Sequence, residues 1–182
     1  MKIRLATKED IPTILEIYRE YIKTPITFEY ELPSKEKFTQ EFSENHHHYP
    51  YLVGEVKGVI CGYAYAHKFK ERVAYKWGAE LSIYLSQKKL GQGLGRKLYE
   101  TLIEILKKQG YKTVYGCITL PNEKSEALHQ KLGFRDVGIF HQSGFKNDVW
   151  HGVIWYEKVI GNMKEIPREP IEVEKVLACE EE

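Results

Sequence analysis

Three glycines at alternate positions, Gly91, Gly93 and Gly95, separate a strand-like run from a helix-like run. The run before them is 81–85, and the run after them is 96–109. A glycine-rich turn at the start of a helix presents unpaired backbone N–H groups and the positive end of the helix dipole. The chemistry that this pattern favours is therefore the binding of an anionic phosphate group.

Two common phosphate sites do not match this turn. A dinucleotide-binding fold has its glycine turn after the first strand, with the spacing G-x-G-x-x-G. Here the turn follows a strand in the middle of the chain, and Arg96 stands where the third glycine would be. A nucleotide P-loop requires Gly-Lys followed by Ser or Thr, whereas this chain continues Gly95-Arg96-Lys97-Leu98. Both kinds of site are excluded.

The elements that position the turn alternate between strand and helix without a strict βαβ repeat. Apolar runs between turn residues predict strands over 3–5, 51–56, 59–66, 77–85, 113–118, 136–146 and 149–159. Helical spacing and capping residues predict helices over 11–22, 35–46, 96–109 and 123–132. Antiparallel hairpins around a central strand–helix–strand unit indicate an α/β (α+β) fold with one mixed sheet.

Length and composition set the class of protein. A chain of 182 residues suits a single domain that can bury a core without disulfides. No apolar run reaches the ~20 residues of a membrane span, and the charged N-terminus lacks the apolar core of a signal peptide. We therefore expect a cytoplasmic protein with no membrane partner. The net charge of +1 is too low and too diffuse to favour a nucleic-acid partner.

The last residues differ from the rest in charge. Seven glutamates stand against three cations within 162–182, so 1–161 is mildly basic, consistent with an anionic ligand. We expect 1–161 to form the domain and 162–182 to be an acidic tail, extended or frayed.

No metal site is predicted. The three cysteines are too few and too scattered for zinc. The triplet His46–His48 is expected to be a polar helix end, because consecutive residues on a helix do not share a face.

Several ordered motifs resemble the GNAT acetyltransferases. The glycine turn has the spacing of their acetyl-CoA signature, Gln/Arg-x-x-Gly-x-Gly/Ala, with Leu90 at the Gln/Arg position. Three further stretches resemble family motifs: Leu5-Ala-Thr-Lys-Glu-Asp-Ile11, Leu120-Pro-Asn122 and Ala127-Leu-His-Gln-Lys-Leu-Gly-Phe134.

Within that family the chain is similar to the phosphinothricin and methionine sulfoximine (sulfone) N-acetyltransferases over nearly everything from Ile3 to Val159. The matching stretches are Tyr49-Pro-Tyr-Leu-Val53, Gly62-Tyr-Ala-Tyr-Ala66, Lys70-Glu-Arg72 with Tyr75, Ala79-Glu80, and Gly144-Phe-Lys146 with Trp150-His151.

The resemblance implies a GNAT fold: a mostly antiparallel twisted sheet flanked by helices, with CoA bound where the sheet splays after its central strand. Acetyl-CoA would be the co-substrate, without a metal. The turn would take its pyrophosphate, and the strand beyond Glu80 would pair with its pantetheine arm. The residues implied in CoA binding are Ile83, Tyr84, Leu85, Gly91, Gln92, Gly93, Leu94, Gly95, Arg96 and Asn122. Leu90 removes one side-chain contact of the motif unless Lys88 or Lys89 replaces it.

Two residues are implied in catalysis. Acetyl transfer to an amine needs a neutral nucleophile, whereas α-amino groups are largely protonated near neutral pH. Glu80 matches the family's catalytic glutamate, and such a carboxylate can remove the proton when burial tunes its pKa. From spacing alone, Glu80 could also be a solvated charge at a strand end. His129 stands where many family members have a tyrosine that protonates the leaving thiolate; it is either that proton donor or a structural residue.

The link 67–76 matches the segment that faces the acceptor in the subfamily. Arginine and lysine there would bind a carboxylate and an oxidised or anionic head group, or they belong to a solvated basic loop. Phe28 would add an apolar wall or simply pack. The residues implied in acceptor binding are Phe28, Lys70, Arg72, Val73 and Tyr75.

The leading hypothesis is direct acetylation of the α-amino group of a small amino-acid analogue, by the homodimer that the subfamily implies. One alternative changes the acceptor to a protein N-terminus or a polyamine, although Lys70 and Arg72 would repel a polyamine. Another is a non-catalytic acyl-CoA sensor, against which the presence of Glu80 argues. Cys61 and Cys117 fall inside predicted strands, so no acetyl-cysteine intermediate is expected.

Overall fold

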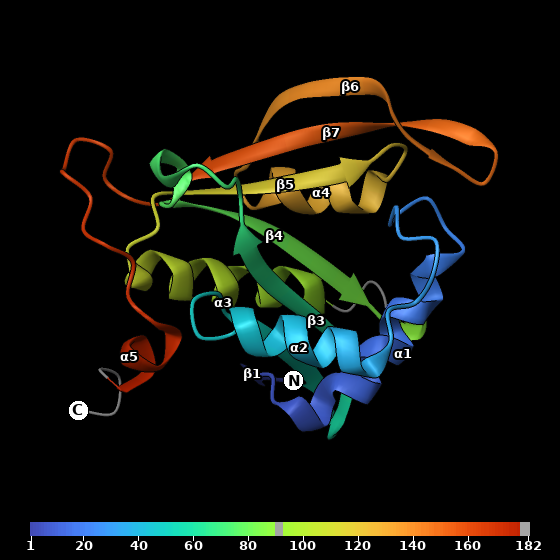
Figure 1. The fold of residues 1–182 in the computed structure, drawn as a ribbon, viewed down its shortest axis with the longest axis horizontal. Helices are drawn as coiled ribbons and strands as arrows, with labels where there is room; N and C mark the ends of the chain where they lie inside the picture. The colour runs from blue at the N-terminus through green and yellow to red at the C-terminus, as the bar shows by residue number, and fades with distance from the viewer. Residues whose placement is uncertain (90–92, 179–182) are drawn as a thin grey trace.

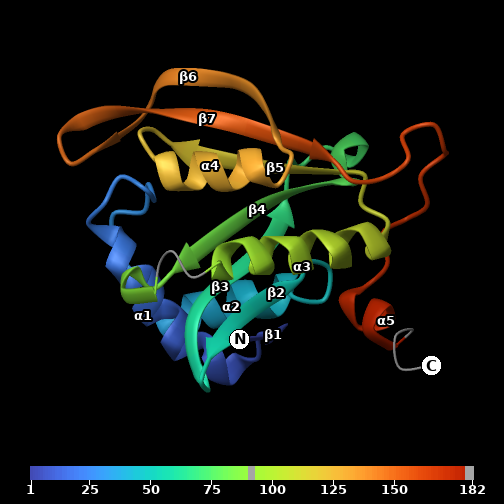
Figure 2. The same cartoon turned by 180° about the vertical axis from the view of Figure 1, so that it is seen from behind.

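The computed structural model describes residues 1–89 and 93–178, and within them a seven-stranded sheet carries helices on both faces (Figures 1 and 2). The strands are β1 (Lys2–Leu5), β2 (Tyr51–Val56), β3 (Val59–Lys68), β4 (Gly78–Leu85), β5 (Thr113–Thr119), β6 (Arg135–Lys146) and β7 (Val149–Val159). Their order across the sheet is β1-β2-β3-β4-β5-β7-β6. Every neighbouring pair is antiparallel except β4 and β5, which are parallel. The predicted mixed, mostly antiparallel sheet is confirmed.

The helices form two layers. Helices α1 (Ile11–Ile22) and α2 (Lys35–Asn45) lie on one face of the sheet, and α3 (Leu94–Gln109) and α4 (Glu123–Lys131) lie on the other (Figures 1 and 2). Short 3-10 turns occupy Lys8–Asp10, Val73–Tyr75 and Gln87–Lys89, and α5 (Val173–Ala178) ends the described chain. None of the described helices combines the length and apolar character that crossing a membrane requires.

Local chemistry fixes the helix ends that the sequence predicts. The Ser34 hydroxyl accepts the Lys37 N–H at 3.2 Å and so begins α2. At the C-terminal end of α3, Gly110 adopts the left-handed region with φ of 103°, and its N–H donates to the carbonyls of Leu106 and Lys107. Glycine enters that region without a Cβ penalty, so the helix stops there.

The central strands β4 and β5 are paired only at their beginnings. The parallel register runs from Gly78 opposite Thr113 to Glu80 opposite Tyr115. Beyond this point β4 stays with β3 and β5 stays with β7, so the two strands diverge (Figure 2). One edge of 81–85 is therefore left without a neighbouring strand among the described residues. The predicted splay after the central strand is confirmed.

The segment expected to be an extended or frayed tail contains a helix at 173–178. Residues 162–172 contain no helix or strand, but α5 packs beside α3. Val173 and Val176 of α5 are 0% and 4% exposed and belong to the main apolar cluster on the α3 side of the sheet. Their spacing of three residues gives a short helix one apolar face. The glutamates around them make the segment acidic as a whole, so its net charge does not reveal this face.

Backbone and side-chain hydrogen bonds hold the tail along its length. The Trp77 indole N–H donates to the Arg168 carbonyl at 2.8 Å. The Gln109 side-chain amide donates to the Ile171 carbonyl at 2.7 Å, and the Ile171 N–H returns a bond of 2.9 Å to the Gln109 carbonyl. These contacts make the end of the described chain part of the fold.

We predict that Val173→Ala lowers the free energy of unfolding by about 2 kcal/mol, because it removes two buried methyl groups and leaves a cavity. Ile166→Ala is the matched control: Ile166 is 94% exposed, so its loss should change the same quantity by less than about 0.5 kcal/mol. Urea unfolding of both variants measures the difference. Equal effects would mean that the tail is not docked in solution.

Candidate active site

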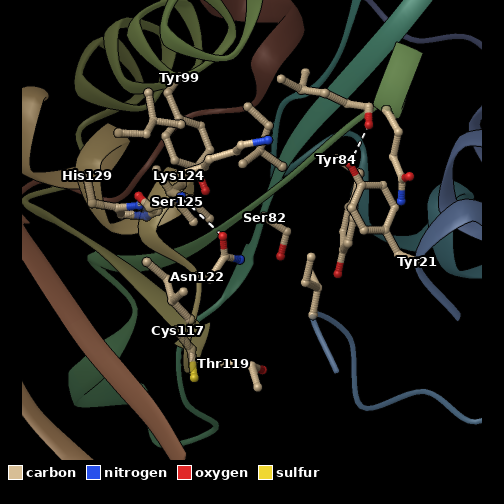
Figure 3. A pocket seen from close by; sticks show the side chains of 17 residues that line it. Tyr21, Ser82, Tyr84, Tyr99, Cys117, Thr119, Asn122, Lys124, Ser125 and His129 are labelled. Carbon is tan, nitrogen blue, oxygen red and sulfur yellow. Dashed lines mark hydrogen bonds between the residues drawn. The ribbon is translucent and has the colours of Figure 1, made fainter. Parts of the chain in front are cut away.

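A cavity of about 390 Å³ opens between the diverging ends of β4 and β5 (Figure 3). Asn122, Ser125 and His129 line one side of it, and Tyr21 and Tyr84 line the other (Figure 3). The backbone of β4 runs between these two walls, with its unpaired edge toward β5. An extended ligand that enters here can pair with that edge as an added strand would.

The start of α3 lies against Leu85, a residue that lines this cavity. Gly93, with φ of 76°, precedes the helix, and the first-turn N–H groups of Leu94, Gly95 and Arg96 have no helical acceptor. A Cβ on Gly95 would lie 3.2 Å from Cδ1 of Leu85, so glycine lets α3 begin close to β4. Free amides at a helix N-terminus suit an anion, and their binding of the CoA pyrophosphate remains a prediction.

Side chains contribute little at this end. Leu94 and Gly95 are buried and offer only their backbone, while the Arg96 guanidinium pairs with Glu100 at 2.7 Å. Gly91 and Gln92, with Leu90, lie outside the described residues.

The β4 residues beyond Glu80 combine a packed side chain with an accessible backbone edge. Ile83 and Leu85 pack against the main cluster on the α3 side. The Tyr84 ring lies edge-on to Tyr18 and Tyr21, with centroids 4.9 and 5.2 Å apart, and the Tyr21 hydroxyl donates to the Leu85 carbonyl. Their roles toward CoA remain predictions.

Asn122 begins α4. Its Oδ1 accepts the Ser125 N–H at 3.3 Å, and the same side chain lines the cavity (Figure 3). Asn122 therefore caps α4, and this places its side-chain amide beside the cavity, where the predicted contact with CoA would be made.

His129 sits among aromatic rings. It is 1% exposed, and the rings of Tyr99, Phe134 and Tyr156 lie 4.9 to 5.4 Å from its centroid. Its Nδ1 is 2.8 Å from the Ser125 carbonyl, an acceptor, so Nδ1 carries the proton. Burial lowers the pKa of the ring, so Nε2 is an unprotonated lone pair near neutral pH. This arrangement supports the structural reading of His129; the proton-donor role stays a prediction.

Glu80 lies where the β4–β5 pairing ends, opposite His67 on β3 and Tyr115 on β5. Burial raises its pKa to about 7. The His67 Nε2 is 4.0 Å from the nearest Glu80 carboxylate oxygen, but burial lowers the pKa of His67, so this ring is neutral when Glu80 ionises. The carboxyl can therefore take up and release a proton near neutral pH, which suits a general base.

Aromatic residues share the face of the sheet on which Glu80 lies. Trp155 stands opposite Cys117 in the β5–β7 pair, one step beyond Tyr115 on that face. Phe69, from the link between β3 and β4, stacks on Tyr115 with ring centroids 3.8 Å apart and lies edge-on to Trp155. The link is thereby anchored at one end of this face.

Phe28 marks the other end. Its ring packs directly on the backbone of Gly144 and lies 6.4 Å from the His151 ring. His151 and Trp155 point to the same side of β7 and are four residues, or about 13 Å, apart. The two predicted acceptor elements thus flank the Glu80 face from opposite ends.

The remaining acceptor candidates are exposed residues of the link between β3 and β4. Lys70 Nζ sits 4.9 and 5.1 Å from the ring centroids of Phe69 and Tyr75. Arg72 is exposed and precedes the turn formed by Val73–Tyr75, in which Val73 is 73% and Tyr75 40% exposed. None of these four lines the cavity between β4 and β5.

Sequence reasoning missed Lys146, which holds the Phe28 loop. Its ammonium is buried, with 2% of the residue exposed, and it donates to the carbonyls of Thr27 and Glu29 at 2.6 and 2.7 Å. The motif Gly144-Phe-Lys146 is visible in the sequence, but its acceptors lie 117 to 119 residues away. Only the structure shows that the β6–β7 hairpin is hydrogen-bonded to this loop through Lys146.

Cys117 corrects one sequence-based inference. It lies inside β5 as predicted, yet the residue is exposed and lines the cavity. Its sulfur is nonetheless crowded enough that burial, and then the charge of Glu80, raise the pKa of the thiol to about 12. A thiol that stays protonated is a poor nucleophile, so the conclusion against an acetyl-cysteine is supported on a different ground.

We predict that Glu80 makes stability pH-dependent. Because the folded pKa of about 7 exceeds the ordinary 4.5, the protonated carboxyl stabilises the fold fully below about pH 4.5, and this contribution is lost as pH rises to about 7. Glu80→Gln keeps a neutral side chain, so its stability relative to the parent protein should be higher at pH 8 than at pH 5 by about 2 kcal/mol. Glu71→Gln, at a side chain 88% exposed, should show no such difference. Urea unfolding at both pH values measures it; a parallel pH dependence in the parent and Glu80→Gln would refute the raised pKa.

Comparisons with known proteins agree with this geometry. The family model described as "Acetyltransferase (GNAT) domain" matches residues 3–155. A phosphinothricin N-acetyltransferase of Streptomyces viridochromogenes is 35% identical over 159 residues, which cover 87% of each chain. An L-methionine sulfoximine/L-methionine sulfone acetyltransferase of Salmonella typhimurium is 30% identical, covering 82% of this chain and 89% of that one. The crystal structure of a phosphinothricin acetyltransferase from Sinorhizobium meliloti, in complex with AcCoA, superposes with a TM-score of 0.89 at 33% identity, covering 93% of this chain and 94% of that one. The chain belongs to the GNAT acetyltransferase family.

Proposed function

We propose that this enzyme transfers the acetyl group of acetyl-CoA directly to the α-amino group of a small amino-acid-like acceptor, with Glu80 as general base. The observation that carries the proposal is the position of Glu80: a carboxyl with a pKa of about 7 lies at the point where β4 and β5 part. The relatives from Streptomyces viridochromogenes and Salmonella typhimurium, named for phosphinothricin and for methionine sulfoximine and sulfone, support this acceptor class.

The residues present fit acetyl-CoA. The cavity of about 390 Å³ has an unpaired strand edge for the amide groups of the extended arm, and the first turn of α3 offers N–H groups to the pyrophosphate. Asn122 adds a side-chain amide beside the cavity. When bound, the cofactor supplies an acetyl thioester; the chain orients it and prepares the attacking amine.

Glu80 prepares that amine by accepting its proton. An α-amino group is largely protonated near neutral pH, and a carboxyl whose pKa is raised to about 7 is a stronger base toward that proton than an ordinary carboxylate. Burial keeps His67 neutral, so this ring adds no positive charge that would lower the pKa of Glu80. The amine then attacks with its lone pair free.

The face of the sheet that carries Glu80 supports a small amino acid as the acceptor. Aromatic rings at Phe69 and Phe28 bound the Glu80 face at opposite ends, which suits a small side chain. Lys70 lies over the Phe69 ring and Arg72 is exposed in the same link, and a cation there can pair with the acceptor carboxylate. We propose that this pairing sets the acceptor orientation.

We predict that Glu80→Gln lowers kcat by about 10²–10⁴-fold, the range for loss of a general base, while acetyl-CoA still binds. In the parent protein kcat should rise with pH through about 7, following the pKa of Glu80, and this rise should vanish in the variant. Release of CoA thiol, followed with acetyl-CoA and L-methionine sulfone, measures both. Cys117→Ala is the control and should retain turnover, because its thiol stays protonated.

The same assay separates the acceptor classes. Faster release with methionine sulfone or phosphinothricin than with a free peptide N-terminus or a polyamine supports the proposal. Faster release with the peptide or the polyamine would overturn the acceptor class but would still support acetyl transfer to an amine. No release with any amine, despite binding of acetyl-CoA, would indicate a sensor and overturn the enzymatic function. Unchanged turnover in Glu80→Gln would refute the assignment of Glu80 as the general base.

We also propose a homodimer that uses the hairpin of β6 and β7. β6 is an edge strand, and several large apolar side chains on the hairpin are 44% to 63% exposed: Val137, Ile139, Phe140, Phe145, Val149 and Trp150. An exposed apolar patch on an edge strand marks an interaction surface.

We predict by light scattering after gel filtration that the parent protein has twice the mass of one chain and that Phe140→Glu halves it. Val59→Glu, at an apolar residue 61% exposed on β3, should leave the mass unchanged. A monomeric parent protein would contradict the dimer.

A further inference from the structure

Two histidines and a glutamate from distant parts of the chain meet at the end of α2. The helix ends at Asn45, so His46 and His47 follow it in a turn, and their rings lie side by side with centroids 3.9 Å apart. The expectation that consecutive residues point to different faces holds only within a helix, and the helix has already ended here. Glu174 of α5 reaches the same place, and its Oε1 is 2.6 Å from Nδ1 of His47.

One potential ligand atom from each of these residues lies within 4.8 Å of the other two. In tetrahedral zinc sites neighbouring ligand atoms are about 3.4 Å apart, since the metal–ligand distances are about 2.0–2.1 Å. The His47 and Glu174 side chains are 55% and 54% exposed, so small rotations can close the remaining gap without disturbing packed atoms.

His46 is held in the state that a metal requires. Its Nδ1 lies 3.0 Å from the Phe42 carbonyl and 3.2 Å from the Ser43 carbonyl, so Nδ1 carries the proton and the Nε2 lone pair is available. The ring also stacks on Phe42, with planes 13° apart and centroids separated by 4.9 Å. A carbonyl partner on the second ring nitrogen is the usual way in which proteins orient a ligating histidine.

We propose that His46, His47 and Glu174 bind a divalent transition-metal ion of the zinc class, with water completing the coordination. Two imidazoles and one carboxylate suit zinc, whereas magnesium and calcium prefer all-oxygen sites. The ion takes the place of the contact between His47 and Glu174.

The site joins two segments that the fold already brings together. The Val173 N–H donates to the His47 carbonyl at 2.9 Å, so the residue before Glu174 is tied to the residue that offers the second imidazole. A metal that bridges these segments binds the folded protein better than the unfolded chain and stabilises it accordingly. It links the end of α2 to α5, and none of its three residues lines the cavity between β4 and β5.

The test uses the full-length protein without a histidine tag. Calorimetric titration with Zn²⁺ should show one site per chain, and zinc at about 100 times its dissociation constant should raise Tm by about 5 °C or more. Magnesium at the same concentration should give no shift. Glu174→Gln and His47→Gln should each weaken zinc binding about tenfold or more, because each removes a ligand.

His48→Gln is the matched control. His48 is an exposed neighbour outside the cluster, so its loss should leave the zinc affinity unchanged. Cobalt in place of zinc should give the visible absorption of a nitrogen- and oxygen-ligated ion in the parent protein and lose it in Glu174→Gln. An equal loss of affinity in His48→Gln and His47→Gln, or zinc binding that survives Glu174→Gln, would show adsorption to surface histidines and overturn the site.

Discussion

The early end of the pairing between β4 and β5 is the constraint on which the rest of the site depends. β5 is paired with β7 from Thr113 to Thr119, and β4 is paired with β3 up to Leu85. The two strands share only three residue pairs, the last of which is Glu80 with Tyr115. Each strand keeps its outer neighbour, and the inner edges separate. An open edge in the middle of a sheet is costly to leave unpaired, and in this fold it faces a cavity.

Helix packing keeps the gap open. On one face of the sheet α3 begins against Leu85, and α4 packs on β5, where the His129 ring fills the space that a side chain at Gly116 would take. Because these helices cover different strands, the space between them is not closed by side chains. The free edge of β4 and the Asn122 side chain therefore border one opening, and the positive end of α3 begins next to Leu85, which also lines it.

The electrostatics of Glu80 follow from the same geometry. At the last paired position the carboxyl is largely covered, and its nearest described basic neighbour, His67, has its own charged form disfavoured by burial. A lysine or arginine in that position would lower the pKa of the carboxyl and make it a weaker base. The raised pKa is thus a product of burial without a compensating cation.

The sequence predicted the elements well because their signals are local. The Ser34 cap and the stop at Gly110 each act within a few residues. It also located Glu80 through a family motif. The contacts that complete the site could not be predicted, since they join distant segments: His67 faces Glu80 only through the β3–β4 register, and Lys146 reaches Thr27 across 119 residues.

The docked tail was missed for a related reason. Two valines in an acidic segment do not by themselves predict a packed helix, because the surface that covers them is provided by α3. Charge and proline content describe the isolated segment correctly, but packing against the domain decides whether it frays.

Hydrogen exchange of the 81–85 amides, with and without acetyl-CoA, tests the central claim most directly. If the free edge of β4 pairs with the cofactor, the amides on that edge should exchange at least about tenfold more slowly in its presence, as should those in the first turn of α3. The amides at 57–58, in the turn between β2 and β3, do not line the cavity and should be unaffected. Exchange that remains unchanged at 81–85 under saturating acetyl-CoA would contradict the account.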